Sequence, residues 1–343
     1  MPLQDVEHQP HALESLRRAL AGGRLHHAYL FTGPAGVGKA LAAQGMAEAL
    51  LCSTPGADGD ACGQCNPCQR AASGQHADLH RVARASKSDG TLQNQIKIDQ
   101  VRALQRALTF KSFEGTRRVV LLIEPEKMNP ATANALLKTL EEPGKDTHFI
   151  LVSDAAHRLL PTIVSRCQRV RFAPLPRTFV SDRLIADCEL SIDDAELVAG
   201  LAEGSLGNAI ELAKSDILTD RRVYIDGVDG RATLGDVPDR LEMAEKLAKK
   251  KPELPIVLHL LRTWYRDVLL IQSGAPIDRV VHQDRIADLR QRARTVSGKE
   301  LIERLERIND AESRIFENNA NVRLTLEALL VRLAGKSMNG RAA

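Results

Sequence analysis

The chain has 343 residues, of which 43% are hydrophobic and 27% are charged, and its formal net charge at pH 7 is +3. The hydrophobic content excludes an intrinsically disordered protein, and the length predicts two or three domains with buried cores. The nearly balanced charge neither requires nor excludes nucleic-acid binding, which would need a local basic face.

The first residues and the cysteine content indicate the cellular compartment of the protein. The first residues are polar and charged, unlike a signal peptide, and no apolar run approaches the length of a membrane span. We therefore expect a cytoplasmic protein with no membrane contact. Six cysteines in such a chain favour metal ligands or buried thiols over disulfides.

A glycine-rich stretch follows a predicted helix and a short predicted buried strand. It reads LFTGPAGVGKA at residues 30–40 and matches the phosphate-loop pattern G-x-x-x-x-G-K, with a helix predicted after it. Three glycines let the backbone turn its N–H groups toward a phosphate, namely Gly33, Gly36 and Gly38. Lys39 can reach the outer phosphates, but Ala40 stands where the Ser or Thr that binds magnesium belongs. We therefore expect a phosphate-loop fold that does not hydrolyse ATP efficiently.

Four cysteines follow the helix after this loop with the spacing C-x9-C-x2-C-x2-C, namely Cys52, Cys62, Cys65 and Cys68. Four thiolates suit a tetrahedral zinc ion, and no open position for a catalytic water is evident, so the expected site is structural. The zinc would hold together a glycine-rich insertion over about residues 52–75 that has little core of its own. An iron–sulfur cluster and unliganded thiols are the two alternatives.

Two later apolar runs predict buried strands that end in polar residues. Residues 119–123 predict a central parallel strand, and Glu124 after it stands where a phosphate-loop ATPase places a second magnesium contact. Pro125 takes the position of the glutamate that would activate water. Residues 149–152 predict another strand, which is followed by Asp154 near the place of a bound γ-phosphate.

The rest of the chain is predicted to be mainly helical. Asp99 is expected to cap a helix, and the sequence APLP at residues 173–176 predicts a linker. Trp264 is expected at the margin of an apolar helical stripe, and residues 335–343 are expected to form a frayed tail. Helical segments are predicted over residues 129–142, 178–213, 241–250, 255–272, 298–316 and 322–333.

Four features together point to a family that none of them would indicate alone. They are the loop GPAGVGK, the four-cysteine insertion, NALLKTLEEP at residues 134–143 and SRC at residues 165–167. In these features the chain resembles the delta-prime family of bacterial DNA polymerase III clamp-loader subunits, among the AAA+ ATPase relatives. The similarity covers about residues 10–210 well, and in the C-terminal part it rests mainly on helical character.

The resemblance implies an α/β fold, in which residues 1–172 form an AAA+ type parallel-sheet nucleotide-binding domain with the inserted four-Cys zinc module. It implies a small helical lid domain at residues 173–214, an all-α collar domain for oligomerisation at residues 215–338 and a tail at residues 339–343. The implied partners are the motor (gamma/tau) and delta subunits and, through the complex, the sliding clamp and primer–template DNA.

The resemblance also gives a role to the arginine of the SRC motif. Arg166 is implied to be a trans-acting arginine finger, which reaches into the ATP site of a neighbouring motor subunit. A guanidinium offers several donors in a rigid plane, which suits the charge that spreads over the γ-phosphoryl oxygens in the transition state.

The same resemblance indicates what this chain lacks. Ala40 replaces the magnesium-binding hydroxyl, Pro125 replaces the catalytic glutamate, and Gly207 stands where motor relatives carry a lid arginine. These losses imply the stator of the ring, a subunit without ATPase activity of its own, whose ATP or ADP binding is weak or absent. Its place in an enzyme would be as part of the DNA-directed DNA polymerase holoenzyme, a nucleotidyltransferase.

Two other functions stay open at this point. One is a self-sufficient AAA+ ATPase, of the motor-subunit type or related to helicase loaders, because Lys39 and the loop glycines are intact. The other is a zinc-ribbon module that binds nucleic acid. The sequence disfavours it, because Arg70 and few other basic residues flank the cysteines.

Overall fold

A computed structural model of the chain describes residues 2–87, 90–114, 117–229 and 237–333. The chain divides into two compact units, Met1–Pro176 and Arg177–Ala343. The boundary follows the last residue of the APLP segment. The division of the rest of the chain at residues 214 and 338 stays a prediction, and the predicted tail lies outside the described residues.

Five parallel strands form the centre of the first unit: β1 (Ala28–Thr32), β2 (Leu79–Val82), β3 (Arg118–Ile123), β4 (Thr147–Ser153) and β5 (Gln168–Arg171). They form one sheet in the order β2–β3–β4–β1–β5. The three inner strands are buried along nearly their whole length, which explains their continuous apolar sequences. The predicted α/β class with a parallel sheet is confirmed.

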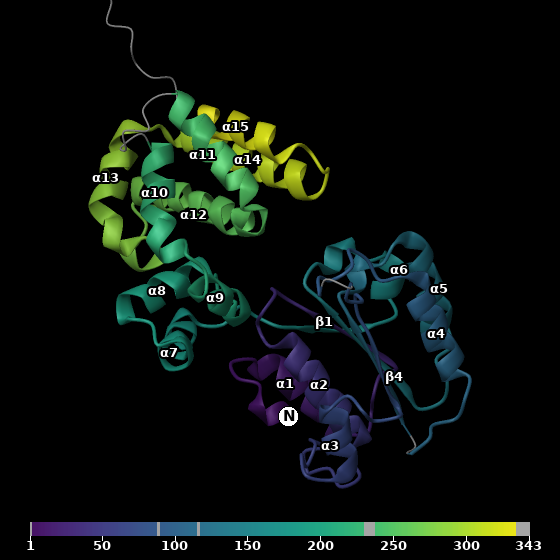
Figure 1. Cartoon of the computed structure of the whole chain (residues 1–343). Helices are drawn as coiled ribbons and strands as arrows, with labels where there is room; N and C mark the ends of the chain where they lie inside the picture. Colours follow the sequence, from purple (N-terminus) through teal and green to yellow (C-terminus); the bar gives the residue numbers. More distant parts are fainter. Residues whose placement is uncertain (1, 88–89, 115–116, 230–236, 334–343) are drawn as a thin grey trace, which may run out of the picture. The chain divides into compact units, whose positions relative to one another are not determined.

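Helices cover both faces of this sheet (Figure 1). They are α1 (Pro10–Ala21), α2 (Lys39–Leu51), α3 (Asn66–Ala72), α4 (Ile98–Leu108), α5 (Pro130–Glu141) and α6 (Pro161–Val164), with 3-10 turns η1 (Leu3–Asp5), η2 (Pro125–Lys127) and η3 (Ala156–Arg158). Helix α2 packs on β1, β3 and β4, whereas α4 and α5 enclose the core on the other face. Because side chains alternate along a strand, Leu30 belongs to the α4–α5 core and Phe31 points to the opposite face.

The strand register brings three candidate segments to one edge of the sheet. Thr32 at the end of β1 pairs with Ser153 at the end of β4, and Ile123 at the end of β3 pairs with Val152. The phosphate loop, Glu124 and Asp154 follow directly after these strands, so all three lie along the carboxyl edge. This is the edge where open parallel sheets bind their ligands.

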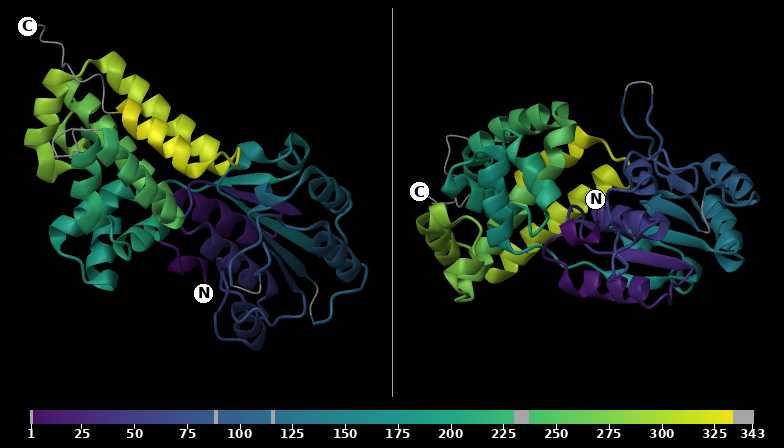
Figure 2. Two further views of the ribbon diagram at one scale, coloured as in Figure 1. Left: turned by 45° about the horizontal axis from the view of Figure 1, so that its top comes forward. Right: turned by 90° about the horizontal axis from the view of Figure 1, so that it is seen from below.

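The second unit is helical in all its described regular structure: α7 (Arg177–Cys188), α8 (Ile192–Leu201), α9 (Leu206–Ala213), α10 (Ile217–Asp229), α11 (Val237–Lys249), α12 (Leu254–Gln272), α13 (Ile286–Thr295), α14 (Gly298–Phe316) and α15 (Val322–Leu333), with 3-10 turns η4 (Lys251–Glu253), η5 (Ile277–Arg279) and η6 (Gln283–Arg285). Helix α12 packs against α13 and α14, and α11 packs against α15. The last two helices, α14 and α15, lie side by side (Figure 2). None of the described helices has both the length and the apolar character that crossing a membrane requires.

Three details differ from the sequence-based expectations. Trp264 was expected at the margin of the apolar stripe, but its side chain is buried and only 1% exposed. The Arg285 guanidinium lies 5.0 Å over its ring, and the His282 ring meets it edge-on. Helix α4 has Lys97 as its N-cap, so Asp99 lies inside the first turn, where its charge favours the helix dipole. Strand β5 was not predicted, because Val170 is its one buried residue and the sequence QRVR has no apolar run.

Candidate functional site

The phosphate loop has the backbone conformation that its glycines permit. Gly33, Gly36 and Gly38 have φ angles of 149°, 66° and 95°, in the range that other residues rarely adopt. At Gly33 a Cβ atom would also lie 2.4 Å from the carbonyl oxygen of Phe172, which follows β5. The glycines are therefore required by the shape of the loop itself, whatever ligand it holds.

Lys39, the first residue of α2, directs its ammonium group back into the loop. Its side chain is 3% exposed, and Nζ donates to the carbonyl oxygens of Gly33, at 2.8 Å, and of Pro34. It also forms an ion pair with Oδ1 of Asp154 at 2.7 Å. An ammonium group has three N–H donors, so the chain itself provides an acceptor for each of them. Sequence reasoning placed Asp154 near the γ-phosphate position but did not foresee that it contacts Lys39.

Ala40 is exposed at the second position of α2 and has only a methyl group. In a working loop the hydroxyl at this position binds magnesium. The side chain here offers no ligand atom, so this part of the site can contribute nothing to metal binding.

Glu124 is engaged by an arginine that sequence reasoning missed. Arg84 donates from Nε to Oε2 at 2.6 Å and from Nη2 to Oε1 at 2.9 Å, a two-point contact with the carboxylate. Glu124 has a φ of 54°, in the left-handed region, and precedes Pro125, which is buried at the start of η2. A magnesium contact from Glu124 would require this ion pair to break. No local sequence signal connects Arg84 with Glu124, because the two residues meet only through the sheet.

Gln9 connects the phosphate loop to the end of the first unit. Its side chain is 3% exposed, and Nε2 donates to the carbonyl oxygens of Val37 at 3.2 Å and Ala173 at 2.8 Å. The backbone N–H of Ala173 donates in turn to Oε1 of Gln9 at 2.9 Å. One buried amide therefore bonds both the loop and the first residue of the APLP segment.

The four predicted cysteines meet at the far end of α2. Cys52 ends that helix, Cys65 is the N-cap of α3, and all four sulfur atoms lie within 4.8 Å of one another. Four sulfurs around a zinc ion at about 2.3 Å would lie about 3.8 Å apart. The Cys52 Sγ lies 3.6 Å from that of Cys62 and 3.8 Å from that of Cys65. The cluster can therefore hold a tetrahedral metal ion.

Neighbouring groups favour the thiolate at two of the four cysteines, because hydrogen bonds lower the pKa of Cys62 and of Cys65. Burial raises the pKa of the other two, Cys52 and Cys68. The backbone N–H of Cys65 lies 3.4 Å from the Cys62 Sγ, and the N–H of Cys62 lies 3.5 Å from the Cys52 Sγ. Burial raises the pKa of the Cys65 thiol, but hydrogen bonds from Ser53 and from the Cys68 backbone outweigh this effect, and its pKa falls to about 5. Thiolates are the forms that bind metal.

Arg166 lies at the surface between α6 and β5. Its Nη2 lies 2.6 Å from Oε1 of Glu141, at the end of α5, and its Nη1 donates to the Thr162 carbonyl oxygen at 2.9 Å. The Arg166 side chain is 35% exposed and that of Glu141 is 46% exposed. The guanidinium is thus held in one orientation while a large part of it remains open to a neighbour.

Gly207 of the second unit is exposed in the first turn of α9, after the N-cap Ser205. It provides no side chain with which to contact a nucleotide. The interpretation of this position as that of a lost lid arginine stays a prediction.

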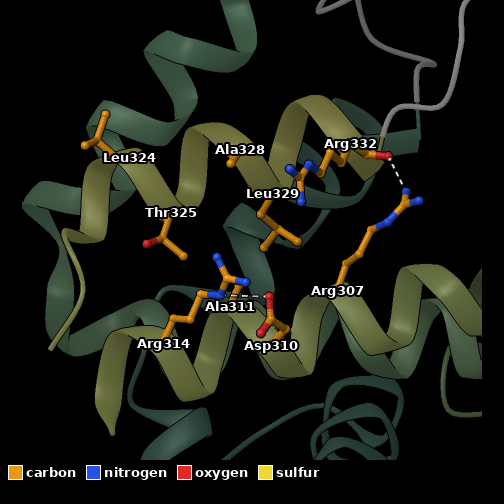
Figure 3. Close-up of a pocket in the computed structure, with 9 residues that line it drawn as sticks. All are labelled: Arg307, Asp310, Ala311, Arg314, Leu324, Thr325, Ala328, Leu329 and Arg332. Atoms are coloured by element: carbon orange, nitrogen blue, oxygen red, sulfur yellow. Dashed lines mark hydrogen bonds and ion pairs between the residues drawn. The ribbon is translucent and has the colours of Figure 1, made fainter. Parts of the chain in front are cut away.

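A hollow of about 220 Å³ lies between α14 and α15 (Figure 3). Two of its three arginines are already engaged: Arg314 forms an ion pair with Asp310 at 2.9 Å, and Arg307 donates to the Arg332 carbonyl oxygen at 3.0 Å. The lining contains neither a pair of nucleophile and base nor a set of metal ligands. We therefore assign no reaction to this hollow.

Comparisons with known proteins agree on one family. The family model described as DNA polymerase III, delta subunit, matches residues 8–176, and a second model, for the carboxyl-terminal part of the delta subunit, matches residues 224–335. The delta' subunit of DNA polymerase III from Bacillus subtilis is 32% identical to this chain, and the alignment covers 95% of the chain and 96% of the relative. The delta' subunit of Pseudomonas aeruginosa is 35% identical, with 91% and 94% covered.

More distant relatives include other DNA polymerase III subunits. The tau subunit of B. subtilis is 26% identical, and the alignment covers 97% of this chain but 62% of the relative. Among solved structures, a gamma subunit-related protein of Thermotoga maritima is 23% identical with a TM-score of 0.43, covering 94% of this chain and 98% of that one.

Proposed function

Because the chain belongs to the delta-prime family of DNA polymerase III clamp-loader subunits, we propose that it is the stator of the clamp-loader ring. In this role it assembles with the motor (gamma/tau) and delta subunits into the complex that loads the sliding clamp onto primed DNA. It does not hydrolyse ATP itself. It supplies Arg166 to the ATP site of a neighbouring motor subunit.

The state of Arg166 is the observation that supports this proposal most directly. Its ion pair with Glu141 is partly exposed on both sides, and such surface pairs contribute about 0–1 kcal/mol. Exchanging Glu141 for a triphosphate would therefore cost little. The bond to the Thr162 carbonyl holds the arginine in place before a neighbour docks.

The phosphate loop supports the other half of the proposal. Lys39 is occupied by acceptors of its own chain, Ala40 offers no magnesium ligand, and Glu124 is bound by Arg84. In each case a group that ATP hydrolysis requires is either absent or already bound within the chain. Nucleotide binding by this chain is accordingly weak or absent.

We also propose that the four-cysteine cluster binds a structural zinc ion. All four ligand positions of a tetrahedral site are cysteines, which leaves no position for a reacting water. The ion would connect the end of α2 to α3 and stabilise the insertion between them.

The test is to reconstitute the complex from this chain with the motor and delta subunits and to measure DNA-stimulated ATP hydrolysis. Arg166→Ala should leave assembly unchanged but lower hydrolysis, because an arginine finger contributes about 10³–10⁵-fold in rate at the one site that it serves. Arg169→Ala, at an exposed arginine of the adjacent β5, is the matched control and should have no effect. Unchanged hydrolysis with Arg166→Ala would remove the finger role.

The alternative is a self-sufficient ATPase of the motor type. The observation in its favour is the intact phosphate-loop backbone, in which Gly33, Gly36 and Gly38 all have the required conformation. The purified chain distinguishes the two functions, since steady ATP turnover at motor-like rates by the chain alone would support the alternative.

A further inference from the structure

We propose that Asp154 acts as an internal substitute for phosphate, which occupies Lys39 and so determines the low nucleotide affinity of the loop. The inference deepens the proposed non-hydrolysing role and rests on it. It assigns to Asp154 the part of a specificity-determining residue. Removing its carboxylate should therefore give the loop a measurable affinity for phosphate-containing ligands.

The ammonium group of Lys39 already has an acceptor for each of its N–H donors. A buried ammonium group needs a partner for each of its donors, and a phosphate normally provides acceptors at this position. Here Gly33, Pro34 and Asp154 provide them, and the side chain of Lys39 is 3% exposed. An incoming phosphate would exchange existing charge-assisted contacts for similar new ones, so it would gain little free energy from Lys39.

A second carboxylate, that of Glu126, lies next to Asp154. Oε1 of Glu126 accepts a hydrogen bond from the Asp154 backbone N–H at 3.2 Å. Oε2 of Glu126 is buried and has no hydrogen-bond partner among the residues that the structure describes. The carboxylate of Asp154 thus contacts the ammonium group of Lys39, and the carboxylate of Glu126 contacts the backbone of Asp154. A phosphate that approached the ammonium would be repelled by the Asp154 carboxylate, and the Glu126 carboxylate adds negative charge behind it.

Asp154 lies at the surface, so its side chain can be changed without disturbing the core. Its side chain is 44% exposed, in contrast to that of Lys39. Asp154 follows the last residue of β4, Ser153, which is fully buried and whose hydroxyl accepts the N–H of Ala155. A substitution at Asp154 therefore changes the charge at the loop without removing a core side chain. The obstacle to phosphate binding is one surface carboxylate, and the loop behind it keeps its shape.

The experiment measures binding of ADP and of inorganic pyrophosphate to the full chain by titration calorimetry, with EDTA present because Ala40 offers no magnesium ligand. Wild type should bind both weakly. Asp154→Ala should bind both at least about tenfold more tightly, equivalent to about 1.4 kcal/mol. The double variant Asp154→Ala/Lys39→Ala should lose this gain, because the ligand then lacks the ammonium.

Asp187→Ala is the matched control for net charge. Asp187 is 43% exposed in α7 and forms an ion pair with Arg183 at 3.0 Å, so the variant loses a similar carboxylate elsewhere. It should bind like wild type. The inference is overturned if Asp154→Ala binds no more tightly than wild type, if Asp187→Ala shows the same gain, or if the double variant keeps it.

A second measurement applies even if Asp154→Ala is poorly folded. In Asp154→Asn the amide oxygen can still accept a hydrogen bond from Lys39, but it carries no charge. Acylation of Lys39, followed by mass spectrometry, should be slow in wild type and faster in Asp154→Asn, and equal rates would contradict the proposal. These readouts use the isolated chain. The stator role is tested separately by assembly and ATP hydrolysis of the complex, so either idea can fail alone.

Discussion

The two ends of helix α2 differ in whether their functional groups are available to a ligand. At its N-terminal end the ammonium of Lys39 is already bound by two carbonyl oxygens and the carboxylate of Asp154. At its C-terminal end the sulfur of Cys52 joins three others at the spacing of a metal site. Both motifs match their sequence patterns well. The difference shows that a motif predicts the shape of a site, whereas the partners of its groups decide what the site can bind.

The largest expected effect concerns the cysteine end. Cys65→Ser should abolish stoichiometric zinc binding and lower the midpoint of thermal unfolding, because structural zinc contributes its binding free energy to folding. Zinc is measured by elemental analysis, and loosening of the insertion is measured by hydrogen exchange across residues 52–72.

The control for this variant is Cys188→Ser, which changes a cysteine of α7 that lies outside the cluster. It should keep the zinc. Native protein without stoichiometric zinc would contradict the metal assignment. Neither end of α2 would then bind the ligand that its motif predicts.

A smaller effect is expected at the glycine end. Gly33→Ala should lower the free energy of unfolding by about 1–3 kcal/mol from backbone strain, with a further loss because its Cβ would lie 2.4 Å from the Phe172 carbonyl oxygen. Gly74→Ala is the matched control, since Gly74 has a φ of 72° but no atom within 4 Å of the added Cβ. Denaturant unfolding of both variants separates strain from overlap, and equal losses would show that the close approach is unimportant.

The smallest effect is a difference in thiol reactivity in metal-free protein. The pKa of Cys65 is lowered to about 5, whereas burial raises the pKa of Cys167 to about 12. A thiol with a lowered pKa is ionised above that value and loses its charge as the pH falls through it. At pH 7 iodoacetamide should therefore modify Cys65 much faster than Cys167, and the Cys65 rate should decline as the pH approaches 5. Peptide mapping measures both rates, and equal labelling would contradict the assigned thiolate.

Local patterns in the sequence allowed most of the fold to be predicted. The buried strands were evident because β3 and β4 are continuous apolar runs, and the cysteine cluster was evident because three of its ligands lie within seven residues, Cys62 to Cys68. Strand β5 was missed because an edge strand with one buried side chain carries no such pattern.

The partners within the candidate site could not be predicted in the same way. The contacts of Asp154 with Lys39 and of Arg84 with Glu124 join residues far apart in the sequence. They follow from the strand register, which brings the ends of different strands together. The roles of Arg166 and Gly207 came from the family resemblance, since neither residue has a local signal of its own.

The double engagement of Gln9 has a mechanical consequence. Its single amide bonds Val37 in the phosphate loop and Ala173 at the exit from the first unit. Tension applied along the chain at residue 173 would therefore be transmitted to the loop through one buried side chain. A displacement of the chain after residue 173 would in this way alter the conformation of the phosphate loop.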